Sequence, residues 1–139
     1  VTGRIKHFIS AFGEHVIAKE VEEALAQAVS KAGGEVSEFT VAPQVNPASG
    51  ELPYHEWFIE FGKLPEDIES FANTLDQGLQ AQNSYYKDLI EGKILQRLKI
   101  TCVPKGTFVE YMKSQGKFGG QNKVQHLSND RKIADNLKW

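Results

Sequence analysis

The chain has 139 residues, of which 40% are hydrophobic and 24% are charged, so it is long enough for one compact domain with a hydrophobic core. Its formal net charge of −2 supplies no field that would recruit nucleic acid or an anionic membrane. A single cysteine excludes an internal disulfide and favours a reducing, cytoplasmic location. No apolar run approaches the ~20 residues of a membrane span, and no signal-peptide pattern opens the sequence.

The first part of the chain predicts a strand and then a helix. Residues 8–12 are typical of a short strand closed by Gly13, and a helix follows from about Ile17. Gly33 and Gly34 are expected to end that helix as a C-terminal cap. The stripe that the helix should bury falls at helical spacing and comprises Ile17, Val21, Leu25, Ala28 and Ala32.

Two further strands are predicted, separated by a loop rich in turn residues. Residues 35–41 predict the first and residues 54–61 the second. Alternation in the second strand assigns Trp57, Ile59 and Phe61 to one face of the sheet. The opposite face then carries Glu56, Phe58 and Glu60.

The second half of the chain predicts more helices and one more strand. Pro65 suits the first turn of a helix that begins near Leu64, and a shorter helical stretch runs on to Gly92. Residues 95–103 alternate as a strand, in which Cys102 falls among the core positions and is expected to be buried and inert. A last helix is expected over residues 129–137.

This order of elements, βαββαβ with a helical tail, predicts an α+β protein. It is typical of a ferredoxin-like sandwich, in which an antiparallel sheet carries its helices on one face. We therefore expect a ferredoxin-like fold with a C-terminal helical extension. The fold alone says little about function, because this arrangement serves many unrelated functions.

The segment from Lys105 to Lys123 carries the most informative pattern. A predicted short helix is followed by the glycine-rich, lysine-bearing run Gly116-Lys-Phe-Gly-Gly-Gln-Asn-Lys123. Glycines let a backbone approach a ligand closely, and lysines offer ammonium groups suited to phosphates or carboxylates. The run lacks the Gly-Lys-Ser/Thr ending of a Walker loop, so we reject an autonomous nucleotide site. On spacing alone, a flexible surface loop is the alternative.

No other group of residues predicts a self-sufficient active site. The four histidines show no metal-ligand spacing with one another or with Cys102, so no metal site is expected. Tyr85 and Tyr86 stand at a helix start, where adjacent aromatic residues are more often docking residues than a base-stacking pair.

Two stretches taken together resemble a known family. Gly3-Arg4, a strand, a glycine turn and then Glu20-Val-Glu22 resemble the motif that opens the small C-terminal domain of adenylate-forming enzymes. Lys105-Gly-Thr-Phe108, Tyr111 and Gly119-Gly-Gln-Asn-Lys123 resemble one branch of these enzymes, the auxin-responsive Gretchen Hagen acyl-acid amido synthetases and their bacterial relatives. The resemblance covers essentially the whole chain, and the ordered co-occurrence of its segments makes it specific.

The resemblance implies that the chain is the C-terminal lid domain of a two-step ligase whose larger N-terminal domain is absent. In such enzymes an acyl acid reacts with ATP, in the presence of Mg²⁺, to give an acyl-adenylate, and an amino acid then takes the acyl group as an amide. The implied partners are the N-terminal domain, the acyl acid and the amino acid, with no nucleic acid and no membrane. The lid domain alone is expected to bind no cofactor tightly and to be inactive.

The resemblance also assigns roles to single positions. Arg4, Gly13 and Lys117 are the expected nucleotide-binding residues, and Lys6 matches the hinge. Lys123 matches the lysine that is brought in for adenylation. Lys117 competes for that role, because superfamily motifs elsewhere place the lysine after a glycine. The chain lacks the Pro-Arg that family members often carry two residues after the lysine that Lys123 matches.

A stand-alone module is the competing hypothesis. A ferredoxin-like small-molecule-binding or interaction module would be complete in itself, and it would bind a ligand or partner without any further domain.

Overall fold

Ten helices and strands make up the described part of the chain. The structure is a computed structural model that describes residues 8–9, 16–44, 50–114, 127 and 131–137. In chain order the elements are β1 (Phe8–Ile9), β2 (Val16–Ile17), α1 (Ala18–Ala32), β3 (Glu35–Gln44), β4 (Tyr54–Lys63), α2 (Ile68–Gln82), α3 (Ser84–Glu91), β5 (Lys99–Val103), α4 (Thr107–Ser114) and α5 (Lys132–Asn136).

The main sheet has three strands, in the order β3-β4-β5, and its pairing is mixed. β3 and β4 are antiparallel, with Phe39 opposite Ile59, whereas β4 and β5 are parallel. A second, two-stranded sheet pairs β1 with β2. The predicted α+β class is therefore confirmed, the predicted antiparallel sheet is wrong, and a ferredoxin-like topology is not confirmed.

The position of the first strand explains this difference. In a ferredoxin-like sheet, another strand separates the two parallel strands that a crossover helix joins. Here Phe8 and Ile9 pair with β2 instead, and β5 lies directly beside β4. Two parallel neighbours need a long crossover connection, and α2 with α3 supplies it.

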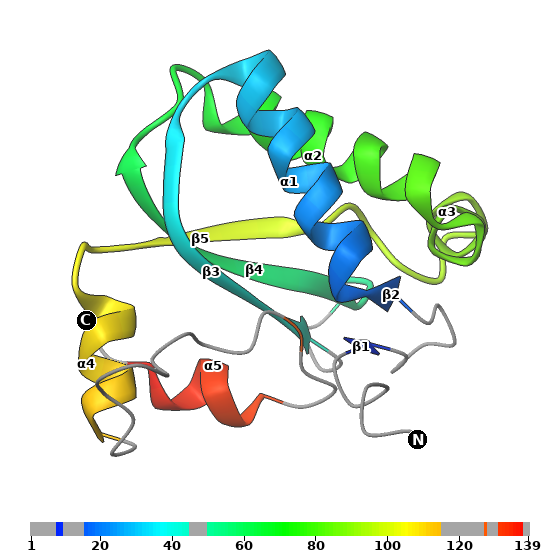
Figure 1. The fold of residues 1–139 in the computed structure, drawn as a ribbon. Coiled ribbons are helices and arrows are strands. Elements are labelled where there is room, and N and C mark those ends of the chain that lie inside the picture. Colours follow the sequence, from blue (N-terminus) through cyan, green and yellow to red (C-terminus); the bar gives the residue numbers. More distant parts are fainter. Residues whose placement is uncertain (1–7, 10–15, 45–49, 115–126, 128–130, 138–139) are drawn as a thin grey trace.

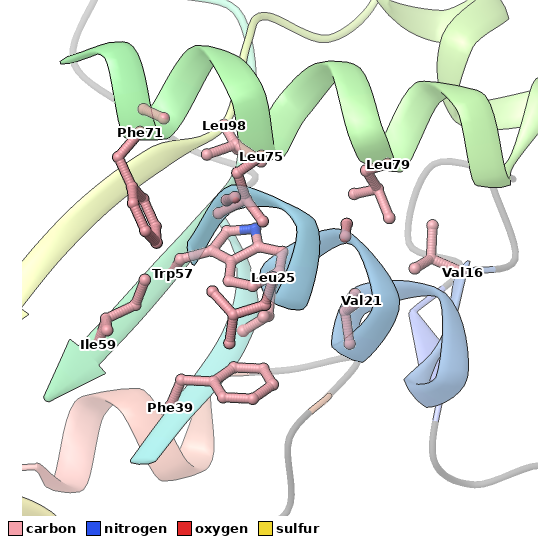
Figure 2. Packing of buried hydrophobic residues seen from close by; sticks show 14 of the residues in the cluster. Val16, Val21, Leu25, Phe39, Trp57, Ile59, Phe71, Leu75, Leu79 and Leu98 are labelled. Carbon is pink, nitrogen blue, oxygen red and sulfur yellow. The ribbon is translucent and has the colours of Figure 1, made fainter. Parts of the chain in front are cut away.

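Helices α1 and α2 cover one face of the main sheet (Figure 1). Trp57 of β4 is fully buried on this face and stacks on Phe39 of β3, with the ring centroids 5.5 Å apart. Figure 2 shows the indole among Leu25 of α1, Leu75 of α2 and Leu98, which precedes β5. The face predicted from the alternation of β4 is confirmed, because Trp57, Ile59 and Phe61 all belong to this core.

Helices α4 and α5 cover the opposite face (Figure 1). This corrects the expectation of helices on one face only with a C-terminal extension, since the extension forms a layer of its own. The reason is that the second face is also apolar enough to need a cover. The second buried cluster comprises Ala42, Phe58, Val103, Phe108, Met112, Ala134 and Leu137.

The strand predicted from residue 95 begins only at Lys99, because the intervening backbone is hydrogen-bonded elsewhere. The amide of Leu95 donates to the carbonyl of Leu89 at the end of α3, and that of Gln96 donates to Pro53. The amide of Leu98 donates to the side chain of Asp76 at 3.4 Å. These donors are therefore not available to a sheet ladder.

Candidate functional site

The five residues that the resemblance singles out fall outside the described residues. Arg4, Lys6, Gly13, Lys117 and Lys123 lie in the ranges 1–7, 10–15 and 115–126. Their assigned roles therefore stay predictions. The structure does describe the two stems that flank residues 115–126, namely α4 on one side and Leu127 with Arg131 on the other.

The first stem begins with a turn that contains Lys105-Gly-Thr-Phe108. Gly106 has a positive φ of 93°, which favours glycine, and the amide of Glu110 donates to its carbonyl at 3.0 Å. The hydroxyl of Thr107 donates to the carbonyl of Pro104 at 2.7 Å and secures the turn. The resembling motif is thus a helix start, and the short helix predicted after it is confirmed as α4.

The side chain of Glu60 in β4 binds the start of α4. The amide of Phe108 donates to Oε1 of Glu60 at 3.2 Å, and Glu60 is 8% exposed. The Phe108 ring and Met112 of the next turn are buried on the same side of the sheet. A helix N-terminus has free amide donors and a partial positive charge, so an acidic side chain suits it.

The second stem joins the opposite edge of the sheet. Leu127 is fully buried and forms an isolated parallel bridge with Val41 of β3. Four residues later, Arg131 places Nη2 2.9 Å from Oε1 of Glu56. The hydroxyl of Thr101 donates to Oε2 of the same carboxylate at 2.7 Å. Glu56 therefore holds together β4, β5 and the C-terminal stem.

Arg131 uses its whole guanidinium group at this place. Besides Glu56, it donates from Nη1 to the carbonyl of Pro43 at 3.4 Å and from Nε to Asp135 at 3.4 Å. The guanidinium carbon lies 5.7 Å from the ring centroid of Phe58, within the range of a cation–π contact. The side chains of Arg131 and Glu56 are 24% and 16% exposed, so the pair is partly shielded from water.

Sequence reasoning missed the roles of Glu56, Glu60 and Arg131. The signal for the two carboxyl groups was present, because alternation placed Glu56 and Glu60 on one face of the strand, next to Phe58. Acidic residues on an apolar strand face predict partners that neutralise them. Which donors arrive there depends on α4 and Arg131, which are far away in sequence.

The histidine and tyrosines for which the sequence predicted structural roles lie in the helical core or at its surface. His55 is fully buried beside Tyr86, with ring centroids 5.2 Å apart, as expected for a strand-packing histidine. Tyr86 is buried and docks α3, whereas Tyr85 is 64% exposed. Within the described ranges, no group of three metal-ligating side chains could hold a metal ion. No helix in those ranges has both the length and the apolar character needed to cross a membrane.

The prediction that Cys102 is buried is wrong, since its side chain is exposed. β5 is an edge strand, and Cys102 lies two residues beyond Ile100, which packs against the helical core. Partial desolvation nevertheless raises the pKa of the Cys102 thiol. A raised pKa agrees with an unreactive thiol, for a reason other than the one expected.

The fold is similar to those of solved acyl acid amido synthetases. A structure described as "GH3.15 acyl acid amido synthetase" matches with a TM-score of 0.71 and 18% identity, over 94% of this chain and 25% of that chain. "AtGH3.15 acyl acid amido synthetase in complex with 2,4-DB" matches with a TM-score of 0.72 and 19% identity over the same shares. This chain thus spans about a quarter of the length of these proteins. No curated protein matches the chain.

The family follows from the sequence. Residues 19–132 match the GH3 family C-terminal domain, which is most of the chain. The chain therefore belongs to the GH3 family, in the region of its C-terminal domain. The resemblance drawn from the sequence motifs is confirmed at the level of this family.

Proposed function

We propose that this chain serves as the C-terminal lid domain of an ATP-dependent acyl-acid amido synthetase. The family match over residues 19–132 is the observation that carries the proposal. The likeness to a quarter of two solved synthetases supports a role as one part of a longer enzyme. This likeness also weighs against the stand-alone module, which no observation supports.

The proposed reaction has two steps. A carboxylate oxygen of the acyl acid attacks the α-phosphorus of ATP, which forms an acyl-adenylate and breaks the bond to the leaving pyrophosphate. The amine of an amino acid then attacks the acyl carbon, loses a proton and displaces AMP, so that an amide results. Because the mixed anhydride is labile in water, a lid that closes over the site protects it.

Lys123 is the residue that we assign to the first step. Negative charge develops where the carboxylate meets the α-phosphate, so a positioned ammonium group stabilises the transition state more than the ground state. Lys117 is the competing lysine on the same segment. Arg4 and Gly13 would contact the nucleotide, and Lys6 would act as the hinge.

Mg²⁺ accompanies ATP in the proposed reaction, and the described residues provide no dedicated cluster of ligands for it. They contain no cluster of three carboxyl, imidazole or thiol groups that could hold a metal ion. Magnesium in such sites is bound largely through substrate phosphates and one or two carboxylates. We therefore assign it no ligand in this chain.

The test uses the full-length enzyme that contains this chain. We expect acid-dependent exchange of pyrophosphate into ATP, and Lys123→Ala should lower its rate by about 10²–10³-fold, the size typical of one lost transition-state contact. Lys117→Ala should lower it much less. Lys113→Ala is the matched control, because Lys113 is an exposed lysine on α4 that only approaches Glu110, at 3.8 Å.

Four outcomes would contradict parts of the proposal. A full-length Lys123→Ala enzyme with unchanged exchange would remove the assignment of Lys123, and a large loss in Lys117→Ala would move the role there. Absence of exchange with a broad panel of carboxylic acids would speak against the synthetase itself. The chain alone should show no exchange, and calorimetric binding of ATP, AMP or an amino acid to it would favour the stand-alone module.

A further inference from the structure

Two carboxyl groups on one face of β4 contact the two stems that flank residues 115–126, the lysine-bearing segment. Glu60 accepts a hydrogen bond from the amide of Phe108 at the start of α4, and Glu56 pairs with Arg131. The two acids are four residues apart on one strand, which corresponds to ~13 Å. Residues 115–126, which carry Lys117 and Lys123, connect the elements that these acids hold.

Glu60 fixes the orientation of α4 on the sheet, which the apolar contacts of α4 alone do not. Phe108 and Met112 bury α4 against Phe58 and Val103, and burial of this kind favours contact without selecting one orientation. A hydrogen bond depends steeply on distance and angle, so the bond from Phe108 to Glu60 sets the position of the helix along β4. A buried acid costs desolvation energy that an apolar residue would avoid, and fixing a register is its best-attested use.

Glu56 does the same for the second stem. Its two oxygens accept from Arg131 and Thr101, so the arginine is tied to both β4 and β5. A guanidinium group is a rigid fork, and its carbon also lies 5.7 Å from the ring centroid of Phe58. A single exposed ion pair would contribute little, but this carboxylate is shielded and belongs to a network.

We propose that Glu56 and Glu60 are positioning residues, which set where the lysine-bearing segment stands by holding both of its stems on the sheet. This inference rests on the proposed function and deepens it. Catalysis by a positioned cation is sensitive to displacements of ~1 Å, which can cost 10²-fold in rate. The two carboxyl groups act through the lysine and do not touch the reacting atoms.

The experiment measures the two half-reactions of the full-length enzyme separately. The variants are Glu56→Gln, which breaks the ion pair, and Glu60→Leu, which removes the acceptor at similar volume. Both should lower kcat for acid-dependent pyrophosphate exchange about 10-fold or more, with KM for ATP changed less than about 2-fold. Aminolysis of a chemically supplied acyl-adenylate should stay within about 2-fold of the parent enzyme, because that step does not need the lysine.

Controls separate positioning from a general loss of structure. Glu69→Gln breaks the pair between Glu69 of α2 and Arg97, which precedes β5, 3.2 Å apart. It should change neither half-reaction. Glu60→Gln retains an acceptor oxygen and should recover most of the exchange rate that Glu60→Leu loses. In Glu56→Gln/Arg131→Gln, the loss should be smaller than the sum of the two single losses, because the two substitutions remove one shared contact.

Hydrogen exchange of the same proteins measures how firmly Glu60 and Glu56 hold the two stems, independently of activity. Amides of α4 should exchange faster in Glu60→Leu, and those of α5 faster in Glu56→Gln, while α1 and α2 stay unchanged. Faster exchange of α4 and α5 together with an unaltered kcat would overturn the positioning role. Equal losses in both half-reactions would overturn it too. A parent enzyme without pyrophosphate exchange would instead refute the proposed function. If amide hydrogen exchange were also unaltered in the variants, the contacts of Glu56 and Glu60 with the stems would be refuted as well.

Discussion

Cys102 lies on β5, at the edge of the main sheet, where its side chain is exposed. The surrounding protein still raises the pKa of its thiol, because partial desolvation disfavours the charged thiolate. The thiolate is the form that reacts with electrophiles. The environment of Cys102, and not inaccessibility, therefore lowers its reactivity at neutral pH.

Alkylation of Cys102 should reflect this shift. The chain has one cysteine, so the rate with iodoacetamide reports this residue alone. In the folded chain, we expect the midpoint of the rate against pH to lie above that of the same chain in urea, where an unperturbed thiol titrates near ~8.5. By linkage, the neutral thiol favours folding below the unfolded pKa, and this contribution is lost as the pH rises through the folded pKa. A folded midpoint equal to or below the unfolded one would refute the assignment.

At the scale of elements, the junction between α1 and β3 depends on two glycines. The amide of Gly33 donates to the carbonyl of Val29 at 2.9 Å and ends α1, as the sequence predicted. Gly33 and Gly34 have φ values of 86° and 93°, a region that other residues rarely adopt. They differ in their surroundings, because a Cβ on Gly34 would lie 3.1 Å from the carbonyl oxygen of Lys63, whereas one on Gly33 would meet nothing within 4 Å.

This contrast gives a matched pair of substitutions. Gly33→Ala should lower the free energy of unfolding by about 1–3 kcal/mol through backbone strain alone. Gly34→Ala should cost more than Gly33→Ala, since the same strain is joined by a close contact with the carbonyl oxygen of Lys63 at the end of β4. Urea denaturation followed by circular dichroism measures both. If Gly33→Ala proves as costly as Gly34→Ala, the close approach at Gly34 has no energetic effect.

At the scale of the whole molecule, Asp76 connects the helical layer to the sheet. This buried side chain of α2 accepts from the hydroxyl of Tyr86 in α3 at 2.5 Å and from the amide of Leu98 at 3.4 Å. The side-chain amide of Gln80 donates to its other oxygen at 2.6 Å. Buried donors of this kind are costly when they lose their acceptor.

Asp76→Ala should therefore destabilise the chain strongly. We expect a loss of about 2–4 kcal/mol in the free energy of unfolding, because the buried hydroxyl of Tyr86 and the buried amide of Leu98 lose their acceptor together. Tyr86→Phe removes one donor and should cost about 1 kcal/mol. Asp88→Ala, at an exposed position of α3, is the control and should stay within about 0.5 kcal/mol. An Asp76→Ala chain as stable as this control would show that the network contributes nothing to stability.

Within the described ranges, the predicted helices and strands are present and several of their ends are shifted. Residues 10–12 of the first predicted strand and 129–130 of the last predicted helix lie outside those ranges. α1 buries Val21, Leu25 and Ala28 of the expected stripe, whereas Ile17 belongs to β2 and is 39% exposed. The alternation of β4 separates Trp57 from Phe58 as predicted. The observed ends of helices and strands differ from the predicted ones where backbone amides donate hydrogen bonds to side chains or to other segments. Asp67 accepts from the amide of Glu69, and α2 begins later than expected. The amides of Leu95, Gln96 and Leu98 donate to acceptors outside the sheet.

The candidate site could be predicted only in part. The motifs from Lys105 to Lys123 indicated the family, and the match over residues 19–132 confirms it. The roles of Lys123, Lys117 and Arg4 stay predictions, because these residues lie outside the described ranges. Glu56 and Glu60 were assigned to the correct strand face, but no local pattern shows that Arg131 and Phe108 meet them there.

The sequence by itself determined the long helices, the strands β3, β4 and β5, the buried faces of α1 and β4, and the family, but not the short strand β2. These properties are local, since they depend on the spacing of side chains along a few turns or one strand. Only the tertiary structure decided that β5 lies parallel to β4, that α4 and α5 cover the second face, and that Cys102 is exposed. Each of these depends on which distant segments pair. Alternation along a strand assigns its faces and leaves its neighbours undetermined.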